Sequence, residues 1–304
     1  MRRINATKVY SLLGMGHAQL PADYTVPTEE TFIRAVLADV QFCHLDFLSF
    51  CHARDSPGIR CETLPARLNL PSWVPDWSVP TTDLFTNNAT MMLDARYNAC
   101  GILPMTVEFQ LPTTFFAVRG AISTVSFVSD LVMATSNTHE AVKMAMQEIC
   151  IILGADKNPT ERYGKTERTL MEAICLAAIG GMQVGSDNQS VRPLDRTGYI
   201  NPGLFDAWIN GHSEHPVFRT FYLLSGVVAR HRRFVKLGNG YFGFAHQDCQ
   251  VGDVVVVLGG GSVPYILRPL PTNNYTFIGT AYVQGMMAGE AFETDTLVRQ
   301  FAIV

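Results

Sequence analysis

Apolar residues recur at helical spacing in three parts of the chain. Pro27 is followed by Thr28, which we expect to cap a helix, and then by two acidic residues that favour a helix start. The stripe that follows would turn one face of this helix toward a core, and it consists of Phe32, Ile33, Val36, Leu37 and Val40. Similar spacing predicts helices over residues 138–153 and 160–180.

Strand-like patterns fill two other regions. Residues 115–133 are rich in β-branched and aromatic side chains around Gly120, which predicts strands. From Phe234 onward, turns rich in Gly, Pro and Asn separate short apolar runs, and the predicted strands are 241–244, 253–258, 265–268, 275–282 and 297–304. The predicted fold class is therefore α+β, with N-terminal and central helices and a C-terminal small antiparallel β-barrel or rolled sheet.

These patterns divide the chain into two regions. Residues 1–230 form a mainly helical region with a few strands and an irregular, tryptophan-containing connection over residues 54–90. Residues 231–304 form a β-rich C-terminal subdomain, which we expect to pack with the first region as one unit. The polar stretch 185–197 predicts a mobile loop.

Composition narrows the classes of partner. The chain of 304 residues is 47% hydrophobic and only 16% charged, which favours an apolar cavity or interface in addition to a core. The net charge is −4 and no basic stripe occurs, so nucleic acid is not expected as a partner. The N-terminus is polar and no apolar run reaches about 18 residues, so we expect no signal peptide, no membrane span and a cytoplasmic location.

No motif for a cofactor or a metal is recognisable. The seven cysteines are scattered without a Cys-x-x-Cys pair, which predicts buried free thiols. His212 and His215 lack further ligands nearby in the sequence, so no metal site is expected. Gly259–Gly261 leads into another predicted strand, so it indicates a hairpin turn and not a phosphate loop. We therefore predict no cofactor.

Three blocks of the sequence carry a family resemblance. The first is Lys8-Val9-Tyr10-Ser11-Leu12-Leu13-Gly14 with Asp23-Tyr24, and the second is Leu70-Pro71-Ser72-Trp73-Val74-Pro75-Asp76-Trp77-Ser78. The third runs from Arg232 to Phe292 and includes Gly240-Tyr241-Phe242-Gly243, Gly252-Asp253, Leu267-Arg268-Pro269 and Gly285-Met286-Met287-Ala288-Gly289-Glu290-Ala291. Together, in this order, the blocks resemble the C-terminal region of fungal heterokaryon-incompatibility (HET) proteins.

The resemblance has a limit that affects function. The family's HET domain lies upstream and contains an aromatic Tyr-x-Trp-Gly stretch, and this sequence has no counterpart of it. The resemblance therefore implies a chain without the N-terminal HET domain, for which induction of cell death is not expected.

Two groups of residues are candidates for a functional site. Trp73, Asp76 and Trp77 would form a pocket wall with a polar handle, or alternatively a structural clip in which Asp76 caps a turn. Arg232, Arg233 and His246 are the candidate catalytic donors, which would face a substrate carbonyl or alternatively form a solvated charged surface. The other residues expected to shape a substrate cavity are Tyr241, Phe244, Tyr282 and Met286.

Two functions from different classes fit this sequence. The first is a cofactor-independent enzyme of fungal secondary metabolism that folds an apolar terpenoid or polyene substrate for a pericyclic, Diels–Alder type cyclisation. A norbornene-forming cyclase of sordarin-type terpenoid pathways is a concrete example. The alternative is a non-enzymatic, HET-related recognition module in self/non-self discrimination. The sequence leaves open whether the chain is an enzyme and whether it forms a homo-oligomer.

Overall fold

The structure is a computed structural model that describes most of the chain. The described residues are 21–40, 45–51, 68–78, 97–110, 115–132, 139–164, 166–184, 191–193, 201–211, 216–229, 232–292 and 299–304. The Lys8–Gly14 block, His212, His215 and most of the connection 54–90 lie outside these residues. The predicted loop 185–197 also lies outside them, except for residues 191–193.

The first predicted helix is confirmed as α2 (Thr28–Asp39). Its N-cap is Pro27, without a side-chain hydrogen bond, so the prediction that Thr28 caps the helix was wrong. Thr28 is already helical, because proline can occupy the position before the first turn, where no backbone donor is needed. The predicted apolar stripe packs inward, with Phe32 and Val36 fully buried, and a short 3-10 helix, η2 (Leu45–Phe50), follows.

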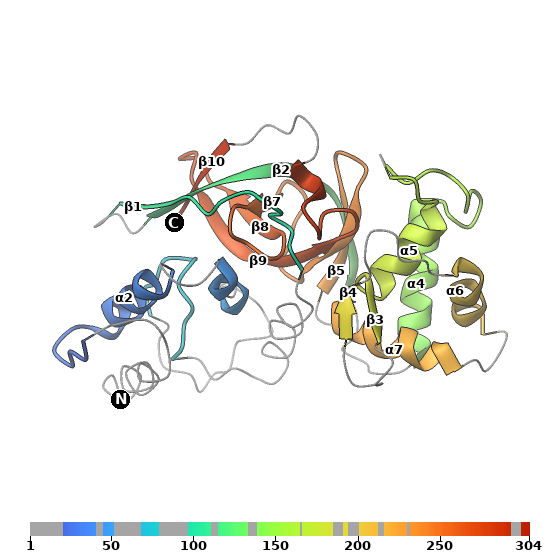
Figure 1. Cartoon of the computed structure of the whole chain (residues 1–304), viewed down its shortest axis with the longest axis horizontal. Helices are drawn as coiled ribbons and strands as arrows, with labels where there is room; N and C mark the ends of the chain where they lie inside the picture. Colours follow the sequence, from blue (N-terminus) through green and yellow to red (C-terminus); the bar gives the residue numbers. More distant parts are fainter. Residues whose placement is uncertain are drawn as a thin grey trace.

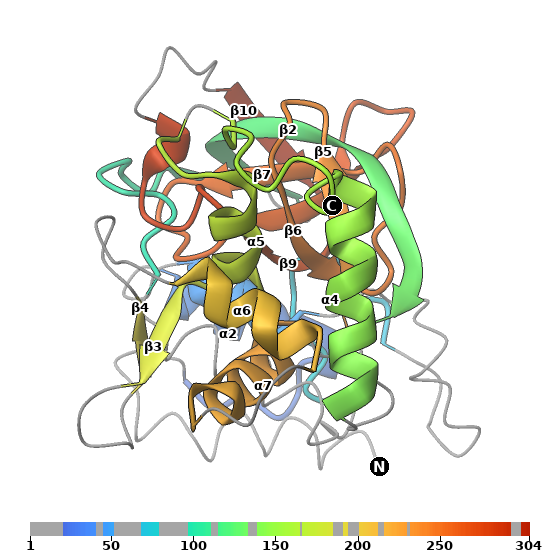
Figure 2. The same cartoon turned by 90° about the vertical axis from the view of Figure 1, so that its right-hand side faces the viewer.

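Four further helices pack against one another on one side of the barrel (Figures 1 and 2). They are α4 (His139–Leu153), α5 (Leu170–Ala178), α6 (Pro202–Ile209) and α7 (Pro216–Ala229). The prediction for 138–153 is confirmed, but the predicted helix 160–180 is too long, because residues 160–164 and 166–169 form turns. A small antiparallel hairpin, β3 (Met182–Val184) and β4 (Val191–Pro193), follows α5.

The remaining strands build one mixed sheet, mostly antiparallel. Within the described residues this sheet has eight strands in the order β1-β2-β5-β6-β9-β8-β7, with β10 paired to β2 and β9. Their bounds are β1 (Val107–Gln110), β2 (Phe115–Val132), β5 (Arg232–Leu237), β6 (Phe242–His246), β7 (Val254–Leu258), β8 (Tyr265–Pro269), β9 (Tyr275–Val283) and β10 (Arg299–Ile303). The long strand β2 also pairs with β7, so β2, β5, β6, β9, β8 and β7 close into a barrel. Figure 2 shows β2 curving over this barrel.

The predicted C-terminal β structure is thus confirmed, including the hairpin turn at Gly259–Gly261 between the antiparallel partners β7 and β8. The barrel also uses β2, which lies far upstream of residue 231 and pairs with β5. The division of the chain into residues 1–230 and 231–304 therefore stays a prediction, and the sheet itself crosses that boundary.

Side chains alternate between two cores on the two faces of the barrel. One cluster draws alternate residues from all the barrel strands and forms the interior: Val125, Val235, Leu237, Ala245, Val255, Ile266, Ile278, Ala281 and Val283. The neighbouring positions join α2, α5 and α7 in a larger cluster, and include Phe234, Phe242, Phe244, Val256, Tyr265, Leu267, Phe277 and Tyr282. The outer face of the barrel is therefore covered, and burial of both faces explains the continuous apolar run of β7.

Candidate functional site

The outer face of strands β5, β6 and β9 brings four of the predicted site residues together. Arg232 pairs with His246, and Phe244 pairs with Tyr282. Ala245 pairs with Ala281, so Thr280 is the next residue along β9, and the His246 side chain packs against the adjacent Gly279. We call Arg232, His246 and Thr280 the Arg232 row, and Phe244 and Tyr282 form the apolar row next to it.

Arg232 is a buried cation in this row. Its side chain spans the width of β6, since Nη2 donates a hydrogen bond of 3.1 Å to Oγ1 of Thr280 on β9. The residue is only 4% exposed, and its Nη1 is buried without a hydrogen-bond partner in the described part of the chain. Burial lowers the pKa of Arg232 from its ordinary value to about 10, which leaves the guanidinium charged at neutral pH.

Tyrosines surround the Arg232 row on the side of the helices. The Tyr97 hydroxyl donates to the carbonyl of Gly180, just after α5, at 2.6 Å, and its ring lies 6.0 Å from that of Tyr282. The Tyr282 hydroxyl donates to Oε1 of Gln284 at 2.6 Å. Burial raises the pKa of Tyr97 well above its ordinary value, so this phenol stays neutral beside the guanidinium.

Two glycines allow this close packing. Gly180 has a φ of 64°, and a Cβ there would lie 2.9 Å from the Tyr97 hydroxyl and 2.3 Å from Val228 on α7. A Cβ on Gly181 would lie 3.2 Å from the Tyr282 hydroxyl. The glycine pair after α5 thus allows the end of this helix to pack closely against the barrel.

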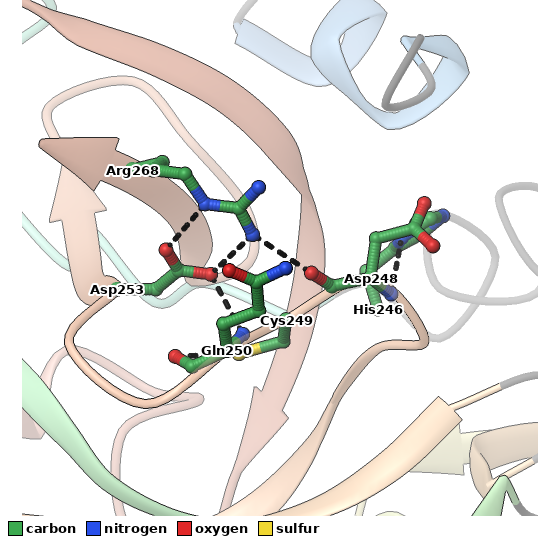
Figure 3. A network of polar contacts seen from close by, with 6 residues as sticks. All are labelled: His246, Asp248, Cys249, Gln250, Asp253 and Arg268. Atoms are coloured by element: carbon green, nitrogen blue, oxygen red, sulfur yellow. Dashed lines mark hydrogen bonds and ion pairs between the residues drawn. The ribbon is translucent and has the colours of Figure 1, made fainter. Parts of the chain in front are cut away.

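The loop between β6 and β7 is fixed by a second polar network, shown in Figure 3. Arg268 Nε and Nη2 donate to the two carboxylate oxygens of Asp253 at 2.9 and 3.0 Å, and Nη2 also donates to the Asp248 carbonyl at 2.8 Å. Asp253 in turn accepts the Gln250 amide at 2.8 Å. This bidentate pair, in which Asp253 is buried and Arg268 half-buried, ties the loop to β8. Both residues lie in the family-like motifs, but the sequence analysis gave them no role.

His246 lies where this loop meets the Arg232 row. Its Nδ1 accepts the backbone amide of Asp248 at 3.3 Å and lies 3.4 Å from the Asp248 carboxylate. The ring also packs on Gly279, where a Cβ would come within 2.8 Å of it. The imidazole is therefore held in one place at the end of β6.

Three other predicted residues lie elsewhere on the barrel. Arg233 is adjacent to Arg232 in sequence but points the opposite way, and its Nε donates to the Ser129 carbonyl at 2.7 Å. Met286 belongs to the interior cluster. Tyr241 stacks edge-on against Tyr163 with 5.6 Å between ring centroids.

The tryptophan segment forms its own cluster near α2. Trp77 meets Phe32 edge-on at 5.1 Å, and the fully buried Trp73 lies 5.7 Å from Phe109. Asp76 accepts the Ser78 amide at 3.0 Å, as the turn-capping alternative predicts. This arrangement matches a structural clip.

The clip is also bonded to the barrel. Ser72 Oγ accepts the amide of Phe277 on β9 at 2.8 Å and donates to the carbonyl of Val304, so it joins the second family-like block to the C-terminus. These bonds hold the segment where β9 begins, whereas the Arg232 row lies further along β9.

Comparison with known proteins identifies the class of the barrel. Residues 207–304 match the Het-6 beta-barrel domain family. A second similarity is to heterokaryon incompatibility protein 6, OR allele, of Neurospora crassa, with 44% identity over 59 residues. This match covers 18% of the chain and only 9% of the Neurospora protein. No solved structure matches the chain.

These matches support the resemblance to the C-terminal region of heterokaryon-incompatibility proteins, and they name no cyclase. In the described residues, no group of three or more His, Cys, Asp or Glu side chains is arranged to hold a metal ion. None of the helices in those residues combines the length and apolarity needed to cross a bilayer.

Proposed function

We propose that this chain is a HET-related recognition module that acts without catalysis in fungal self/non-self discrimination, in the cytoplasm. The observation that carries the proposal is the match of residues 207–304 to the Het-6 beta-barrel domain family. The similarity to a protein whose name refers to heterokaryon incompatibility supports the same process.

The organisation of the barrel favours binding of a partner by the helices and loops around it. Side chains from all six barrel strands fill the interior, so contacts with a partner would use the helical layer or the loops. The outer face of α4 offers exposed apolar side chains, since Met144 is 67% and Ile151 is 66% exposed. They lie seven residues apart on one helix and therefore share a face.

The test is capture of a defined partner class. The tagged chain is expressed in a filamentous fungus, and the proteins that co-purify are identified by mass spectrometry. We expect recovery of a HET-domain protein, with weaker recovery by a Met144→Lys, Ile151→Lys variant if α4 contributes to binding. Growth and heterokaryon formation are compared in strains with and without the gene. The proposal is refuted if no HET-domain protein co-purifies and the gene has no effect on heterokaryon formation.

A cofactor-free cyclase is the second candidate, and the Arg232 row is the observation that favours it. Arg232 and His246 occupy paired positions on β5 and β6, and the pair Phe244 and Tyr282 lies two residues along β6. Donors beside an apolar wall would activate the carbonyl of a hydrophobic substrate and favour one folded conformer.

This candidate has its own assay. The purified chain is incubated with a terpenoid aldehyde that carries a diene and an activated dienophile. Catalysis would give faster conversion and a stereoselectivity that Arg232→Met abolishes and Arg233→Met retains, because Arg233 points away from the row. Conversion equal to that in buffer alone would rule the cyclase out and leave the recognition proposal untouched.

A further inference from the structure

Arg232 is a buried guanidinium without a negatively charged partner in the described part of the chain. No salt bridge to Arg232 occurs within the described residues, and its only hydrogen-bond acceptor there is the neutral hydroxyl of Thr280. Buried charges in proteins are normally paired with an opposite charge, because removing an ion from water is costly. By contrast, Arg268, which is more exposed, holds the carboxylate of Asp253 with two hydrogen bonds.

Among the described residues, the tyrosine that interacts with Arg232 supplies no negative charge. Tyr97 is neutral, and its hydroxyl proton is already donated to the Gly180 carbonyl. Phe244 and Tyr282 pair with each other on β6 and β9 and are buried in the apolar cluster on the outer face of the sheet. Arg232 therefore offers the Nη1 donor and a positive charge in a place that water reaches poorly. A planar guanidinium of this kind matches the two oxygens of a carboxylate.

We propose that Arg232 and Thr280 form a binding site for the carboxylate group of a separate small-molecule ligand. The carboxylate would accept hydrogen bonds from Nη1 and Nη2 of Arg232 and from the Thr280 hydroxyl. The ligand is a small organic acid or a larger apolar acid whose hydrocarbon part lies along Phe244 and Tyr282. This site is independent of the recognition function proposed above.

Carboxylate binding is tested on the full chain by thermal unfolding at constant ionic strength. Formate, acetate, benzoate and decanoate are titrated against sodium chloride, and benzamide serves as the uncharged counterpart of benzoate. We expect a carboxylate to raise the Tm by on the order of 5 °C at saturation, whereas chloride and benzamide do not. Equal shifts with chloride, or no shift with any acid, would overturn the proposal.

Variants separate the site from general salt effects. Arg232→Met should abolish the carboxylate-dependent shift, and because it replaces an unpaired buried charge, the ligand-free Tm should stay equal or rise. Arg233→Met is the matched control, and it should keep the full shift. If Arg232→Met does not fold, Thr280→Val tests the site instead. Loss of the Thr280 hydroxyl donor should weaken carboxylate binding about 5-fold. An unchanged affinity in Thr280→Val would contradict the site.

The same titrations show which kind of acid the site binds. Tight binding of formate and acetate would indicate a small organic acid, whereas binding that strengthens from acetate to benzoate and decanoate would indicate a larger apolar acid. Either pattern supports the site, provided that Arg232→Met abolishes the carboxylate-dependent rise in Tm.

Discussion

Gly243 lies on β6 at the position where the backbone of β9 comes closest. A Cβ on Gly243 would lie 1.9 Å from the carbonyl oxygen of Tyr282 and 2.8 Å from Cα of Val283. Both obstacles are backbone atoms of the paired strand, so no side-chain rotation can relieve the clash. The glycine of the Gly-Tyr-Phe-Gly motif thus sets the distance between the two strands that carry Phe244 and Tyr282.

We expect Gly243→Ala to destabilise the fold by about 3 kcal/mol or more, because the overpacked strands must separate. Urea unfolding measured by circular dichroism provides the free energy. Gly238→Ala is the control, since its nearest neighbour would be the Thr124 carbonyl oxygen at 3.7 Å, and its effect should stay within about 0.5 kcal/mol. Equal effects of the two substitutions would contradict this account of Gly243.

Asp253 is the acid on which the β6–β7 loop depends. It is 2% exposed and accepts hydrogen bonds from Arg268 and from the Gln250 amide. We expect Asp253→Asn to lower the free energy of unfolding by about 3 kcal/mol, because Arg268 loses its charged partner. Asp130→Asn removes an exposed acid 3.7 Å from Arg233 and should change stability by less than about 0.5 kcal/mol. A loss no larger than that of Asp130→Asn would show that the pair is not structural.

At the scale of elements, α5 shows why its start was misplaced from the sequence. Thr169 accepts the Glu172 amide and Glu172 accepts the Thr169 amide, which is a complete capping box. The apolar periodicity that predicted a helix from residue 160 takes no account of such a boundary. The Thr-x-x-Glu pattern was present in the sequence, and it would have placed the start at Leu170.

We expect Thr169→Ala to destabilise the chain by about 1 kcal/mol, because the Glu172 amide in the first turn of α5 loses its side-chain acceptor. Thr169→Ser keeps the hydroxyl and should be nearly neutral. The comparison is made by urea unfolding, where the midpoint should fall while the m-value stays constant. A drop of the same size in Thr169→Ser would point to lost packing of the methyl group instead.

Strand alternation predicted the C-terminal elements well. The apolar runs around Phe244, Val256 and Phe277 became β6, β7 and β9 at nearly the expected residues. Such runs show that a segment is a strand, but they do not show its neighbour in the sheet. Residues 115–133 were predicted as strands, yet their pairing with β5, β7 and β10 depends on contacts distant in sequence.

At the scale of the whole molecule, strand register also decided which candidate residues met. Arg232, His246, Phe244 and Tyr282 come together because β5, β6 and β9 are adjacent and in matching register. Arg233 was predicted with them, but strand alternation turns it away. The Trp73–Trp77 segment contacts α2 and β1 instead, and no local pattern in the sequence could separate these two clusters.

The buried thiols and phenols make the whole fold sensitive to alkali. Burial raises the pKa of Cys150 from 9.0 to about 11 and that of Cys249 to about 12. Tyr163, Tyr265 and Tyr282 are raised in the same direction by burial. Above pH 9 the unfolded chain therefore releases protons that the folded chain keeps, and the free energy of unfolding falls as pH rises. Arg232 has the opposite effect and raises the free energy of unfolding as pH rises above 10. The reason is that its pKa in the folded chain lies below its pKa in the unfolded chain.

We therefore expect the free energy of unfolding to be nearly constant from pH 7 to 8.5 and to fall steeply between pH 9 and 11, when measured by urea titration in the presence of a reductant. Cys249→Ala removes one of these protons, so its slope against pH should be shallower by up to about 1.4 kcal/mol per pH unit. Val251→Ala changes an exposed, non-titrating neighbour and should keep the original slope. Stability that stays level through pH 11 would mean that the thiols and phenols ionise as readily in the folded chain as in the unfolded one, and that the two barrel faces are open to water.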